Sequence, residues 1–92
     1  MNKKERFMEA LMKMGFQVGE YGWMSPSAYA NGAFDISAEH DPKTGYIQQY
    51  FDYYEEYMNQ TISDEMEEMA ARYGYWFEWY NPGVVVAIPD EY

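Results

Sequence analysis

The last third of the chain carries the pattern that most restricts how this sequence can fold. Residues 75–80 are all aromatic apart from Glu78. In a strand, the residues at 75, 77 and 79 would lie on one face and those at 76, 78 and 80 on the other. Residues 81–83 include a proline followed by a glycine, a pair that favours a type II turn. Residues 84–88 are apolar on both sides. The sequence therefore predicts a β-hairpin whose second strand lies at the centre of an antiparallel sheet.

Two helices are predicted from apolar residues at helical spacing. In residues 3–14, Phe7 and Leu11 are four positions apart, and a glycine follows the segment. Residues 63–73 begin at Ser63, which is a good N-cap, and acidic residues follow in the first turn, where they suit the helix dipole.

The remaining segments give weaker signals. The alternation of residues in 16–22 and in 34–38 predicts two short strands, of which the second is half-buried. The composition of residues 23–31 predicts a loop, and that of residues 41–45 predicts a turn. Residues 46–58 fit helical spacing but are rich in tyrosine, which suits a strand as well; helix is the favoured interpretation.

Together these segments predict the fold class and the number of domains. The 92 residues suffice for one domain and are too few for two. We expect a single small α+β domain over residues 1–92, with an antiparallel sheet of three to four strands. Two to three helices are expected to pack on one face of this sheet.

The charge of the chain excludes several kinds of partner. Sixteen acidic residues against six basic ones give a net charge of −10, which would repel nucleic acids and anionic membranes. A basic protein surface is the complementary partner. The chain has no cysteine, which excludes disulfides and thiolate metal sites, and it shows neither a signal segment nor an apolar run long enough for a membrane span. We expect a cytoplasmic protein that acts inside a host cell.

The sequence offers no convincing catalytic or metal-binding group. The single histidine, His40, reads as an exposed turn residue, and the carboxylates of residues 64–68 point outward around a predicted helix. No serine lies in a nucleophile motif, and a chain of this length has little room for a deep cleft. We therefore expect no enzymatic activity, no cofactor and no metal.

The partner-binding residues are expected on two neighbouring helices, predicted over residues 46–58 and 63–73. Carboxylates there would imitate nucleic-acid phosphates, and an exposed tyrosine would add packing or stacking contacts. An equally balanced interpretation is that these tyrosines build the core of a domain with few leucines and isoleucines. The candidate residues are Asp52, Tyr53, Glu55, Glu56, Asp64, Glu65, Glu67 and Glu68.

A second hypothesis is self-association. Residues 3–14 hold four bases against two acids, a net charge of +2, whereas the rest of the chain holds two bases against fourteen acids, a net charge of −12. The basic helix of one protomer could pair with the acidic part of another. The alternative to an inhibitor is thus a general interaction module, as a monomer or as a salt-sensitive homodimer.

In size, acidity, lack of cysteine and aromatic content, the chain resembles small phage and mobile-element proteins that inhibit host defence, of the anti-CRISPR or anti-restriction type. The segments at residues 32–40 and 76–83 also look like open reading frames of phages or plasmids. The resemblance implies a DNA mimic that binds a Cas effector or a restriction nuclease stoichiometrically, without catalysis and without binding nucleic acid itself.

Overall fold

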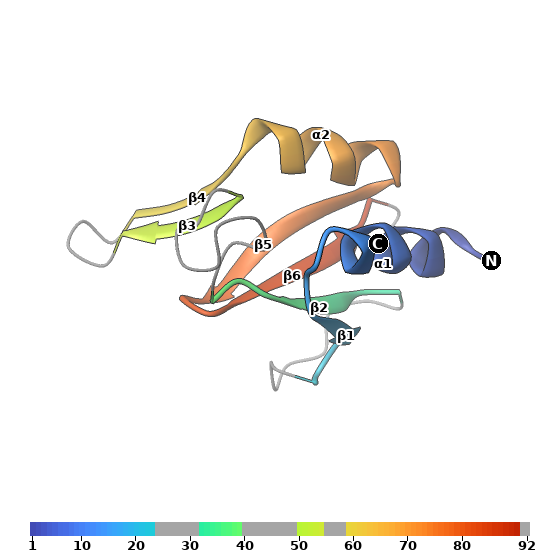
Figure 1. The fold of residues 1–92 in the computed structure, drawn as a ribbon, viewed down its shortest axis with the longest axis horizontal. Coiled ribbons are helices and arrows are strands. Elements are labelled where there is room, and N and C mark those ends of the chain that lie inside the picture. The colour runs from blue at the N-terminus through green and yellow to red at the C-terminus, as the bar shows by residue number, and fades with distance from the viewer. Residues whose placement is uncertain (24–31, 40–49, 55–58, 91–92) are drawn as a thin grey trace.

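A computed structural model describes residues 1–23, 32–39, 50–54 and 59–90 of the chain. Its elements follow in the order α1 (Lys3–Lys13), β1 (Val18–Glu20), β2 (Phe34–Ser37), β3 (Phe51–Tyr54), β4 (Asn59–Ile62), α2 (Asp64–Arg72), β5 (Tyr75–Asn81) and β6 (Val84–Pro89). The strands form an antiparallel four-stranded sheet in the order β1-β2-β6-β5 and a separate antiparallel pair, β3-β4 (Figure 1). The predicted α+β class is confirmed.

Both described helices lie on one face of the four-stranded sheet, as predicted. Phe7 and Leu11 of α1 and Met66 of α2 belong to the same buried cluster as Phe34 of β2 and Val85 of β6. In Figure 1, α1 lies in front of the sheet and α2 runs beside β5. Helix α1 begins at a reciprocal cap, in which Asn2 accepts from the Glu5 backbone and Glu5 accepts from the Asn2 backbone.

The predicted hairpin is confirmed, including the central position of its second strand. Strand β6 pairs with β2 on one side and with β5 on the other, and every residue from Val84 to Pro89 is buried. Alternate residues of β6 belong to two different buried clusters. Val85 and Ala87 face the helices, whereas Val86 and Ile88 join a smaller cluster on the opposite face.

Strand β2 differs from its expected half-buried character. The alternation of residues 34–38 predicts that one face of the strand is exposed to solvent, yet Asp35 is fully buried. Asp35 pairs with Gly19 and with Val86, so it lies on the face opposite the helices. On that face Ala33, Val86 and Ile88 form a second buried cluster with Tyr21 packed against it, so the second face of β2 is covered as well.

The favoured helix over residues 46–58 is wrong. Residues Phe51–Tyr54 form β3, which pairs antiparallel with β4. Tyrosine and phenylalanine prefer strands, and here pairing with β4 overrides the helical spacing. The core interpretation holds for Tyr50, which is buried against Phe16 with ring centroids 5.8 Å apart.

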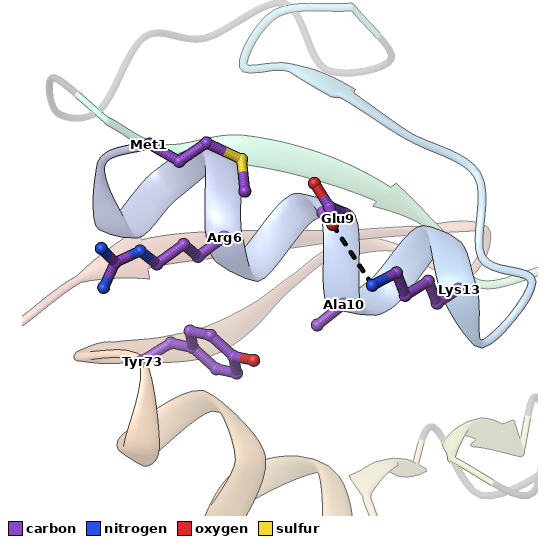
Figure 2. Close-up of a pocket in the computed structure, with 6 residues that line it drawn as sticks. All are labelled: Met1, Arg6, Glu9, Ala10, Lys13 and Tyr73. Atoms are coloured by element: carbon purple, nitrogen blue, oxygen red, sulfur yellow. Dashed lines mark ion pairs between the residues drawn. The ribbon is translucent and has the colours of Figure 1, made fainter.

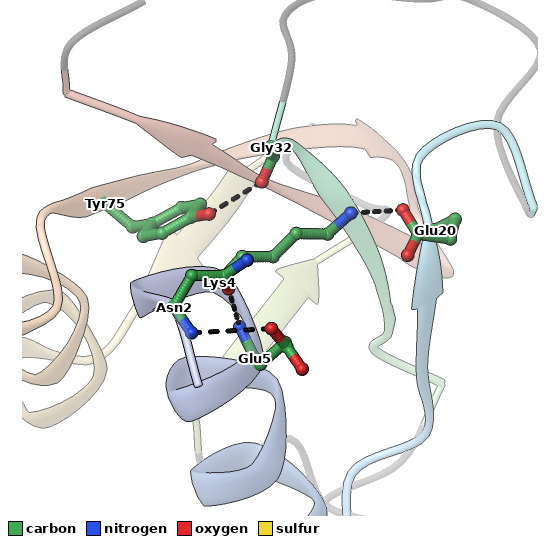
Figure 3. Close-up of polar contacts among 6 residues, drawn as sticks. All are labelled: Asn2, Lys4, Glu5, Glu20, Gly32 and Tyr75. Carbon is green, nitrogen blue, oxygen red and sulfur yellow. Dashed lines mark hydrogen bonds and ion pairs between the residues drawn. The ribbon is translucent and has the colours of Figure 1, made fainter.

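Figure 3 shows polar contacts at the beginning of α1 and in the neighbouring sheet. Lys4 forms an ion pair with Glu20 at the end of β1, so α1 is linked to the sheet edge. The Tyr75 hydroxyl donates to the Gly32 carbonyl at 2.7 Å. Burial raises the pKa of Tyr75, and the negative charge of Glu20 raises it further. His40 and the expected turn at residues 41–45 lie outside the described residues.

Candidate partner-binding surface

Helix α2 begins where its sequence predicts. The Ser63 hydroxyl accepts from the Met66 backbone at 3.2 Å, and Ser63 itself has an extended backbone. The helix ends at Arg72 with Tyr73 as its C-cap, and Gly74 follows with a φ of 79°, in the left-handed region that favours glycine. Met66, Met69 and Ala70 are buried, which fixes the rotation of the helix about its axis.

This rotation turns the acidic side of α2 outward. Four predicted partner-binding residues lie on this helix and are exposed: Asp64, Glu65, Glu67 and Glu68. None of the four forms an ion pair or a side-chain hydrogen bond within the described part of the chain. Glu68 lies four residues after Asp64 and three after Glu65, which is the spacing at which like charges repel each other on a helix. We call these four residues the acidic face of α2.

The other four predicted site residues do not join this face on a second helix. Asp52 is half-buried on β3, where its backbone carbonyl accepts from the Thr61 hydroxyl at 3.4 Å. Tyr53 belongs to β3, so it lies on a strand. Glu55 and Glu56 lie outside the described residues. The prediction of two adjacent acidic helices is therefore wrong, and the described acidic face belongs to α2 alone.

The basic residues of α1 are mostly engaged within the protomer. Lys4 pairs with Glu20, and Lys13 pairs with Glu9 at 3.3 Å. The Lys3 ammonium lies 5.6 Å from the centroid of the Tyr75 ring. Arg6 is the one base of α1 without an ion pair or a ring contact in the described structure. The pair with Glu20 therefore reduces the positive charge that α1 offers to another molecule.

A shallow, open depression of about 400 Å³ lies between α1 and the C-terminal end of α2. Figure 2 shows Arg6 and Lys13 on α1 and the ring of Tyr73 below them. The remaining lining residues are Met1, Glu9 and Ala10. Because the depression is open to water, it cannot desolvate a reacting group, and no pattern in the sequence predicted it.

An aromatic contact that sequence reasoning missed lies at the end of β1. A β-carbon built on Gly19 would lie 2.5 Å from Cε3 of Trp23, so the indole lies directly over this glycine. A turn produces the contact: the Trp23 backbone donates to the Glu20 carbonyl at 2.9 Å, and Gly22 has a φ of 97°. The sequence places Trp23 in a loop, and no local pattern reveals which residue its ring will meet.

The described residues contain no cluster of three or more His, Cys, Asp or Glu side chains that could hold a metal ion. Within the same part of the chain, neither helix has the length and apolar character needed to cross a membrane. Comparison with protein-family models, curated proteins and solved structures finds no match for this chain.

Proposed function

We propose that this chain is a non-catalytic interaction protein that binds a basic, nucleic-acid-binding surface of another protein. The acidic face of α2 carries this proposal. Its four carboxylates are exposed and uncompensated, and they are held on a capped helix whose other side is buried. A rigid row of negative charges can take the place of phosphates in a groove lined with lysine and arginine.

Glu68 is the carboxylate of this face that the helix dipole does not favour, because it lies beyond the first turn. Asp64 and Glu65 repel it at helical-neighbour spacing, and Arg72, four residues after Glu68, offsets only part of this repulsion and forms no ion pair within the described structure. Surface charges that act against the local stability of an element are typical of functional sites. An inhibitor of the anti-CRISPR or anti-restriction type, acting in the cytoplasm of a host cell, is the function that fits this surface.

The alternative, a self-assembling module, finds less support in the charges. It needs a basic helix with cations available to a second copy. Instead, Lys4 and Lys13 are paired with carboxylates of their own protomer. The oligomeric state at low and high salt, measured by light scattering, tests this alternative directly.

The test of the proposal is a pull-down from bacterial lysate with the wild-type chain and the variant Glu65→Lys/Glu68→Lys. The wild type is expected to capture a DNA-binding protein and to release it at high salt or when duplex DNA is added. The variant is expected to capture none, because the acidic face of α2 has lost its net negative charge.

A matched control changes the net charge by the same amount elsewhere. Glu39→Lys/Asp90→Lys reverses two exposed acids outside α2, and this variant should still capture the partner. Circular dichroism should show that both variants are folded. Equal capture by the wild type and the α2 variant would overturn the proposal, as would a partner that neither salt nor DNA releases.

A further inference from the structure

We draw no further inference here: the strongest candidate, the shallow depression between α1 and the C-terminal end of α2, is lined by Arg6 but also by the paired Glu9 and Lys13, and nothing in the structure shows what covers it.

Discussion

At the scale of single residues, aromatic rings replace the aliphatic side chains that usually fill a small core. Phe7 stacks on Tyr73 with centroids 4.9 Å apart and contacts Phe34, Tyr75 and Phe77 at 5.2–5.7 Å. One ring of α1 thus joins β2, β5 and the end of α2. Such contacts depend on the tertiary fold, and the sequence showed only that Phe7 lies on the apolar side of a helix.

Replacing Phe7 should therefore be the more damaging of two aromatic truncations. Phe7→Ala is expected to lower the free energy of unfolding by about 3–5 kcal/mol, because the residue is fully buried and meets four rings. Trp79→Ala should cost less, since Trp79 is half-buried and lies 6.3 Å from Phe51. Urea denaturation of both variants measures the order, and a larger loss for Trp79→Ala would contradict the described packing.

At the scale of elements, the sequence predicts those whose signals are local. Helix α1, helix α2 and the β5-β6 hairpin form where cap, spacing and turn residues agree. Strand β3 was missed because the isoleucine at 47 and the aromatic residues at 50, 51 and 54 satisfy a helix and a strand equally, and the decision depends on pairing with β4. For the candidate site, the acidic face of α2 was predictable, whereas the contact of Trp23 with Gly19 was not.

The acidic face of α2 implies that one of its residues weakens its own helix. Glu68→Gln removes two like-charge spacings, with Asp64 and Glu65, and one favourable spacing, with Arg72, so on balance it should raise the free energy of unfolding by about 0.2–0.5 kcal/mol. Lys13→Gln on α1 is the matched opposite, because it removes a favourable pair with Glu9, and should lower it by a similar amount. Thermal denaturation at low salt should show opposite shifts, and both should shrink at high salt.

At the scale of the whole molecule, a net charge of −10 is confined within principal extents of 37 × 26 × 21 Å. The Debye length is about 30 Å at 0.01 M salt, so charges across the entire molecule interact there, and it falls to about 10 Å at 0.1 M. The described bases lie on the helices, and the exposed Trp76 lies on the opposite face of the sheet. The two faces therefore differ in chemistry as well as in architecture.

Salt should stabilise this molecule. The Tm is expected to rise when potassium chloride is increased from 0.01 M to 0.1 M, because the shorter Debye length weakens the repulsion among carboxylates. The variant Glu65→Lys/Glu68→Lys has a net charge of −6, from −10 and two reversals of +2 each, and should show a smaller rise. A Tm that falls with salt would mean that ion pairs such as Lys4–Glu20 outweigh the repulsion.

The central position of β6 has a consequence for how the chain folds as it is made. Strand β6 follows every other strand in the chain, yet it separates β2 from β5 and pairs with both. During synthesis, β1, β2 and β5 leave the ribosome before the strand that joins them exists. The four-stranded sheet can therefore close only after residues 84–89 have emerged, so β2 and β5 wait for β6 before they are held in one sheet.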